Sequence, residues 1–135
     1  MIAVDSSVVV AAFASWHESH GAARDAVAGA PLAVGHALLE TYSVLTRLPP
    51  PHRADPTLVG SFLAAAFPAS PLVLPAADLQ RFLVRLPGLL ITGGAVYDAL
   101  IGASAEAARA TLLSLDSRAM RTYERIGCDA RMLVG

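Results

Sequence analysis

An apolar strand that ends in a carboxylate is the feature that most constrains this chain. Residues 2–4 are Ile, Ala and Val, Asp5 follows them, and an apolar helix is expected directly afterwards over 7–14. Helices cover both faces of a central strand in a parallel α/β sheet, so such a strand is apolar throughout. Ligands of these sheets bind beyond the carboxyl ends of the strands. The first strand therefore places Asp5 at the mouth of a binding site.

The rest of the chain alternates between short apolar segments and helical patterns. Further strands are predicted over 32–34, 72–74, 111–115 and 131–134. The remaining helices are predicted over 18–28, 37–48, 55–67, 76–86, 93–108 and 117–126. This alternation indicates an α/β fold with a parallel sheet and helices on both faces. We expect a single domain over 1–135, because the length suits one core and no linker or repeat interrupts it.

The composition excludes several classes of function. A net charge of −1 supplies no general attraction for nucleic acid, so nucleic-acid binding needs a local patch or a metal site. All ten basic residues are arginine, which excludes any mechanism that needs a lysine. The single Cys128 excludes an internal disulfide and suits a reducing compartment. With neither a membrane span nor a signal-peptide pattern in the sequence, we expect a cytoplasmic protein without membrane contacts.

Three further acids fall where they can join Asp5. Asp116 follows the predicted strand over 111–115, and Asp116 and Asp5 are each explained equally well as the N-cap of the next helix. Glu40 and Asp98 lie inside predicted helices, so neither is a cap. Their neighbours on the helix surface are mostly small or apolar, and a lone carboxylate is unfavourable there unless it is paired or binds a metal. Exposure of either acid to solvent is the alternative.

Four carboxylates at one edge of a sheet repel one another. This repulsion raises the pKa of at least one of them, and a divalent cation relieves it. Mg²⁺ and Mn²⁺ prefer oxygen ligands. Such sites promote phosphoryl transfer by activating water and neutralising developing charge. The pattern therefore favours a metal-dependent enzyme that acts on phosphate esters.

Four segments resemble motifs of the PIN-domain ribonucleases, specifically the VapC toxins of bacterial toxin–antitoxin pairs. In chain order they are IAVDSS at 2–7, ALLETYSVL at 37–45, YDALI at 97–101 and LLSLD at 112–116. The resemblance implies a five-stranded parallel sheet in the order 3-2-1-4-5. It also implies a Mg²⁺- or Mn²⁺-dependent endoribonuclease, in which an activated water attacks the phosphorus in line and the 3′-oxygen leaves.

The resemblance also implies roles for individual residues. The implied catalytic residues are Asp5, Glu40, Asp98 and Asp116. The implied metal ligands are Asp5, Asp98 and Asp116. Ser114, together with Ser6 or Ser7, would hydrogen-bond the carboxylates or water. Many relatives carry a further acid or Asn shortly after the fourth acid, where this chain has Ser-Arg-Ala at 117–119, so one or two metals remain possible.

RNA and protein contacts are expected on the surface. Arg118, Arg121 and Arg125 recur at helical spacing and form either a phosphate-binding patch or an ordinary solvated helix face. Trp16 either stacks on a base or packs at a helix junction or partner interface. The resemblance further implies a VapB-like antitoxin bound at the third and fourth helices, near Phe62 and Phe67. It implies a homodimer or a toxin–antitoxin hetero-oligomer; ordinary core packing explains many of those apolar residues equally well.

Three other functions compete with this interpretation. A phospho-receiver protein also carries Asp after its first strand, but such proteins generally use a nearby lysine, and the two helix-borne acids would be unexplained. A catalytically degenerate PIN fold would act only as a protein- or RNA-binding module. A DNA-directed nuclease is the third alternative, since only the family resemblance favours RNA over DNA.

Overall fold

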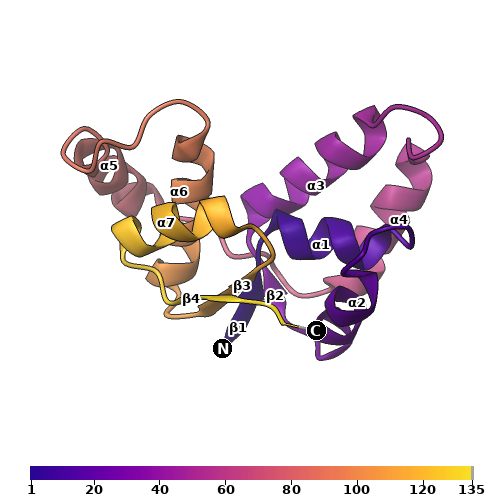
Figure 1. The fold of residues 1–135 in the computed structure, drawn as a ribbon. Helices are drawn as coiled ribbons and strands as arrows, with labels where there is room; N and C mark the ends of the chain where they lie inside the picture. Colours follow the sequence, from indigo (N-terminus) through magenta and orange to yellow (C-terminus); the bar gives the residue numbers. More distant parts are fainter. Residues whose placement is uncertain (135) are drawn as a thin grey trace.

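The computed structural model describes residues 1–134; Gly135, the last residue of the predicted domain, lies outside them. Its strands are β1 (Ile2–Val4), β2 (Leu32–Ala33), β3 (Thr111–Ser114) and β4 (Ala130–Met132). They form a four-stranded parallel sheet in the order β2-β1-β3-β4 (Figure 1). The N-terminal strand β1 is therefore central, with one early and one late strand beside it. The parallel α/β architecture is confirmed.

The predicted number of five strands is wrong for the described chain. Residues 72–74 form no strand and instead make a single parallel bridge, between Leu72 and Val34 at the outer edge of β2. Pro71 and Pro75 bracket this segment. Proline lacks the N–H that a ladder needs and restricts the residue before it, so pairing does not extend beyond Leu72. The order 3-2-1-4-5 is accordingly replaced by the four-stranded order above.

Seven helices are present within residues 1–134, each close to its predicted position. They are α1 (Ser6–Phe13), α2 (His20–Ala28), α3 (Gly35–Arg47), α4 (Pro56–Ala66), α5 (Ala76–Arg85), α6 (Ala95–Ala107) and α7 (Ser117–Ile126). The start of α4 follows from Pro56 at its first position and from the Asp55 carboxylate, which accepts the Thr57 N–H at 3.0 Å. Gly127 ends α7 in the left-handed conformation, with φ of 87°.

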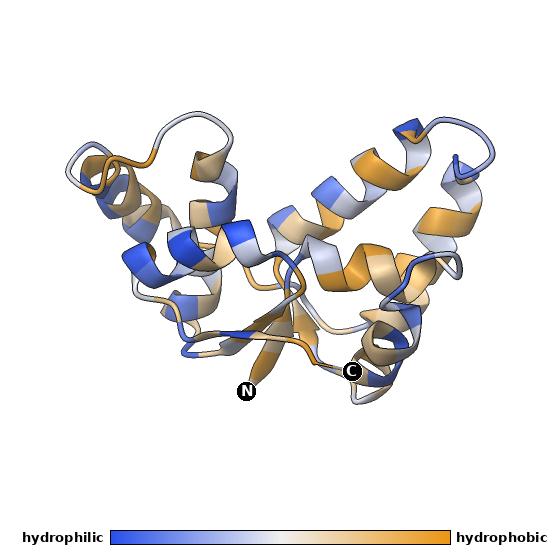
Figure 2. Cartoon of the chain, viewed as in Figure 1, coloured by the Kyte–Doolittle hydropathy of each residue, from blue (hydrophilic) through white to orange (hydrophobic). Residues whose placement is uncertain are grey.

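Helices cover both faces of the sheet, as predicted, and each face has its own apolar core. Val4 of β1 packs with α1, α2 and α4, whereas its neighbour Ala3 packs with α5, α6 and α7. Helix α3 contributes to both cores through Ala37 and Leu38. Figure 1 shows the two groups of helices as separate lobes that diverge from the sheet. Figure 2 shows that the strands are largely hydrophobic.

None of the helices within residues 1–134 combines the length and the apolarity that a bilayer crossing requires.

Candidate active site

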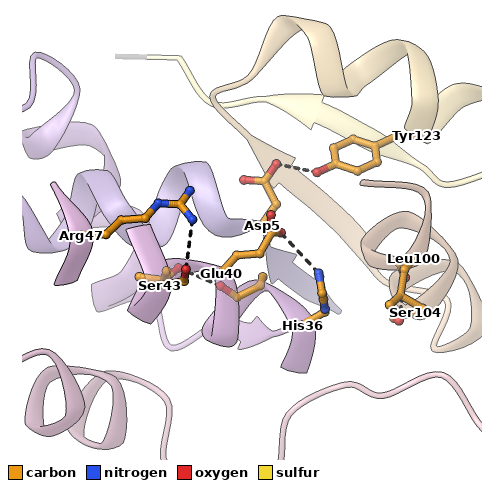
Figure 3. Close-up of polar contacts among 10 residues, drawn as sticks. Asp5, His36, Glu40, Ser43, Arg47, Leu100, Ser104 and Tyr123 are labelled. Carbon is orange, nitrogen blue, oxygen red and sulfur yellow. Dashed lines mark hydrogen bonds and ion pairs between the residues drawn. The ribbon is translucent and has the colours of Figure 1, made fainter. Parts of the chain in front are cut away.

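Asp5 lies directly after β1 and is buried, with only 2% of its surface exposed. One carboxylate oxygen accepts hydrogen bonds from the backbone N–H groups of Ser7 at 3.0 Å and Val8 at 3.3 Å, so Asp5 is the N-cap of α1. The Tyr123 hydroxyl donates to the other oxygen at 2.7 Å (Figure 3). Burial raises the pKa of Asp5, although hydrogen bonds from neighbouring hydroxyl groups oppose this shift. Asp5 is therefore both the N-cap of α1 and a member of the acidic site.

Two serine hydroxyls join the ends of β1 and β3. The Ser7 hydroxyl donates to Asp5 and accepts the backbone N–H of Leu115 at 2.8 Å. Ser114 is fully buried, and its oxygen accepts the N–H of Asp116 at 3.0 Å. The two serine oxygens are 3.4 Å apart. These contacts hold the backbones that carry Asp5 and Asp116 in register.

Glu40 enters the site from α3. Its Oε1 atom is buried and has no hydrogen-bond partner among the described residues. His36 Nε2, one helical turn earlier, lies 3.9 Å from this oxygen (Figure 3). The His36 ring stacks on Tyr97 of α6, with centroids 5.4 Å apart and planes at 9°, so the two lobes touch beside the acids. Burial, and then the charge of Asp5, raises the pKa of Glu40.

Asp98 lies in the first turn of α6 and is half-buried. Burial raises its pKa to about 6, and the charges of Glu40, Asp116 and Asp5 add to this rise, while His36 opposes it. Coulomb interactions weaken with distance, so this mutual influence requires the carboxylates to be near neighbours. Asp116 is exposed and caps α7 by accepting the N–H of Arg118 at 2.9 Å. The structure thus brings all four predicted acids to the carboxyl edge of the sheet.

The donor set suits a hard divalent cation. Burial and neighbouring carboxylates raise the pKa values of Asp98 and Glu40, and a buried Glu40 oxygen has no hydrogen-bond donor among the described residues. Oxygen ligands of this kind are the ones that Mg²⁺ and Mn²⁺ prefer. Across residues 1–134, however, no three Asp, Glu, His or Cys side chains lie together in a group that could hold a metal ion. Asp5 and Asp116 both accept hydrogen bonds as caps. Mg²⁺ is usually held by one or two carboxylates and keeps several waters, so such an open arrangement fits this ion.

The predicted arginines lie on α7, which begins next to Asp116. Arg118, Arg121 and Arg125 are all exposed, whereas Ala119 and Tyr123 on the other side of the helix are buried. Figure 2 shows the corresponding hydrophilic segments of α7. A row of cations therefore leads away from the acidic cluster along one helix.

Two residues of the site were not apparent from the sequence. Tyr123 falls on the apolar face of α7, and a buried tyrosine hydroxyl generally needs a hydrogen-bond partner. This need is the only feature of the sequence that could have indicated its bond to Asp5. His36 precedes Glu40 by four residues, a spacing that places the two side chains on one helix face. Its contact with Tyr97 depends on the packing of the two lobes and has no local signal.

Comparison with known proteins identifies the family. The PIN domain model matches residues 2–125, a range that contains all four acids. The chain belongs to the PIN-domain family. Ribonuclease VapC40 of Mycobacterium tuberculosis, from strains CDC 1551 / Oshkosh and ATCC 25618 / H37Rv, is 47% identical over 133 residues, which are 98% of this PIN domain and 99% of the relative.

A second relative covers nearly as much of this PIN domain. Ribonuclease VapC27 of Mycobacterium tuberculosis, strain ATCC 25618 / H37Rv, is 43% identical over 127 residues, 93% of this chain and 92% of the relative. The resemblance to VapC-type PIN domains, drawn from four short motifs, is confirmed.

Proposed function

We propose that this PIN domain is a Mg²⁺- or Mn²⁺-dependent endoribonuclease and the toxin of a type II toxin–antitoxin pair in the cytoplasm. The observation that carries the proposal is the clustering of four carboxylates: burial, and then the charges of the other three acids, raises the pKa of Asp98 to about 6. Relatives of nearly the same length bear the name ribonuclease, which favours RNA as the substrate. Carboxylates that cluster at a strand edge repel one another, and a bound cation would neutralise this repulsion. Such a cluster is therefore a candidate functional site.

The roles of the residues follow from their surroundings. Asp5, Asp98 and Asp116 would hold the cation, and Ser7 and Ser114 keep the first and last of these on aligned backbones. When bound, the cation would neutralise charge on the scissile phosphate and lower the pKa of a nearby water.

Glu40 is the candidate proton acceptor. Its buried Oε1 has no donor among the described residues, and its raised pKa makes it a better base than an exposed glutamate. Glu40 would take a proton from the attacking water as the bond between phosphorus and the 3′-oxygen breaks. The departing 3′-oxygen would take a proton from solvent, so the products are a 5′-phosphate and a 3′-hydroxyl. Arg118, Arg121 and Arg125 would contact the phosphates of the flanking RNA.

The test is cleavage of a mixed tRNA and rRNA substrate by the purified chain, with Mg²⁺ or Mn²⁺ against EDTA. We expect Asp98→Asn to reduce the rate at least about a hundredfold, since even residues that only support metal ligands contribute about 10- to 100-fold. Asp25→Asn, on the exposed surface of α2, is the matched control and should cleave as wild type does.

Cleavage that survives both EDTA and Asp98→Asn would contradict the proposal, as would a 2′,3′-cyclic phosphate product. Single-stranded DNA of the same length, tested in parallel, separates an RNA-directed from a DNA-directed nuclease.

Protein partners are proposed at an apolar groove between the two lobes. The groove has a volume of about 350 Å³ and is lined by parts of α3, α5, α6 and the segment around Leu72. Leu39 and Val73 at its rim are 71% and 69% exposed. Phe67, by contrast, is buried, and Phe62 packs edge-on against Phe13 with centroids 5.3 Å apart, so both phenylalanines belong to the core. We propose that a VapB-like antitoxin or a second copy of the chain covers the groove.

A further inference from the structure

A second groove leads away from the acidic cluster on the side of α1 and α3. Ser6, Ser7 and Leu115, beside the two strand-end acids, line one end, and His17 and Ser19 of the loop between α1 and α2 line the other. Its volume is about 350 Å³, within the range of small-molecule pockets. The groove therefore connects the edge that carries Asp5 to a loop at the far end of α1.

Aromatic rings continue the path at this far end. Trp16 lies with its ring centroid 6.1 Å from that of His17 and 4.2 Å from that of His52, which belongs to the loop between α3 and α4. Although His52 lies against it, Trp16 remains 48% exposed. An indole that is braced by a neighbouring ring and still open to solvent presents a flat apolar surface at the end of the groove.

The charges along the groove suit the base and sugar of a nucleotide at its far end. Glu18 lines that end, and a carboxylate repels phosphate but can accept hydrogen bonds from a base edge. No arginine lines the groove among the described residues; Arg53 is exposed and follows His52 in the sequence, and Arg47 lies near enough to Glu40 to lower its pKa. This lining is mixed, with serine hydroxyls and a histidine, unlike the largely leucine and valine lining of the groove near Leu39.

We propose that this second groove holds a nucleotide that flanks the scissile phosphate and that Trp16 stacks on its base. The substrate class is RNA that is unpaired at the cut site, since a base inside a duplex cannot reach an aromatic platform. The inference rests on the proposed ribonuclease function and adds a binding subsite to it. Continuity with the serines beside Asp5 favours RNA here over a protein partner.

Trp16 is the single tryptophan of the chain, so its fluorescence reports directly on the platform. The probe is oligoadenylate of about eight nucleotides, added in EDTA so that binding is measured without cleavage. We expect it to quench the fluorescence, and Trp16→Ala to weaken binding, measured by anisotropy of a labelled probe, about tenfold or more. Trp16→Phe, which keeps a ring, should stay within about threefold of wild type.

Control variants test the placement of the platform. Val84→Ala removes an apolar side chain that is even more exposed than Trp16, on α5 in the other lobe, and should bind as wild type does. His52→Ala removes the brace and should weaken binding less than Trp16→Ala, which gives a second measurement if Trp16→Ala fails to fold by circular dichroism. Unchanged affinity in both Trp16→Ala and His52→Ala would overturn the inference and leave a protein contact as the role of this surface.

Three further outcomes test the inference, and the last two separate it from the proposed function. Equal quenching by tripolyphosphate, which has no base, would overturn stacking. Quenching by oligoadenylate without any metal-dependent cleavage would support the platform and overturn the nuclease. Cleavage by wild type with the same KM in Trp16→Ala would overturn the platform and leave the nuclease intact.

Discussion

At the scale of single residues, the site is governed by the free-energy cost of holding carboxylates together away from water. Asp5 meets part of this cost with hydrogen bonds from Ser7, Val8 and Tyr123. Among the described residues Asp98 has no comparable set of donors, and burial, with the charges of the other acids, raises its pKa to about 6. The cost of keeping Asp98 ionised in the fold therefore destabilises the folded metal-free chain at neutral pH.

The pH dependence of stability follows from this shift. The folded state keeps the Asp98 proton up to about pH 6, whereas the unfolded state loses it near the ordinary value of 3.8. The folded state thus binds more protons between these values, so the Asp98 contribution to the free energy of unfolding falls as pH rises through this window. We expect Asp98→Asn to be more stable than wild type at pH 8 in EDTA and similar to it near pH 4, as measured by urea unfolding.

Asp25→Asn is again the control and should follow the wild-type curve at both pH values. A lower stability of Asp98→Asn at pH 8 would show that Asp98 makes favourable contacts that outweigh the repulsion.

Removing the Tyr123 hydroxyl tests how much its hydrogen bond to Asp5 contributes to stability. Tyr123→Phe removes the donor to the buried Asp5 oxygen and leaves the ring in place, so we expect a loss of about 1–3 kcal/mol in the free energy of unfolding. Tyr97→Phe is the matched control, since Tyr97 is exposed and its stacking on His36 survives the change; its effect should stay within about 0.5 kcal/mol. Equal effects in urea unfolding would mean that the Asp5 contact contributes nothing.

At the scale of elements, the close approach of α6 and α7 seats Tyr123 against Asp5. Gly102 of α6 makes this possible, because a Cβ there would lie 2.9 Å from Ile126 Cγ2 and 3.0 Å from Tyr123 Cδ1. Both contacts involve side chains of the buried face of α7, which have little room to move. The absence of a side chain on one helix thus determines the position of a hydroxyl group in the site.

Two alanine substitutions test this packing. Gly102→Ala should destabilise the fold by about 1–3 kcal/mol through overpacking. Gly60→Ala, in the middle of α4 with no atom within 4 Å of the new Cβ, should instead stabilise by about 0.5–1 kcal/mol through helix propensity. Thermal unfolding of the two variants shows whether each change stabilises or destabilises the fold. A stabilising Gly102→Ala would show that α6 and α7 can separate without cost.

The helices and strands could be predicted from the sequence where residues within the element, or next to its ends, determine its position. Helix ends were predicted well where a cap marks them, as at Asp116 and Gly127 for α7. The segment at 72–74 was predicted wrongly as a strand, because its apolar residues resemble one while its prolines limit pairing to Leu72. Whether an apolar triplet pairs once or along its length depends on the neighbouring strand, which the local sequence does not describe.

At the scale of the whole molecule, the exposed apolar groove between the lobes is where a copy or partner would bind. Leu39→Glu places a charge at its rim, and we expect any dimer of the isolated chain to shift toward monomer because burying an unpaired carboxylate is unfavourable. Light scattering after gel filtration measures the mass. Val84→Glu is the control, since Val84 is 80% exposed and lies outside the groove, and a dimer lost in both variants would argue against this surface.

More of the candidate site than of the surface around it could be predicted from the sequence. Asp5 and Asp116 follow strands, and topology alone brings the ends of parallel strands to one edge. Glu40 and Asp98 were selected by their apolar helix faces, and both lie at that edge. The Tyr123 bond, the His36 stack and the groove to Trp16 each join segments far apart in the sequence, so they appear only once the lobes are packed.

The central position of β1 determines when, during synthesis, the sheet can be completed. Asp5 lies 118 residues before Tyr123, whose hydroxyl donates to its carboxylate, and its strand pairs with residues 111–113. A growing chain cannot pair β1 with β3 or form the Asp5 contact until it has been synthesised as far as Tyr123. If the chain has the proposed ribonuclease function, its active site would form late in synthesis, and the proposed antitoxin would have time to bind before the site is complete.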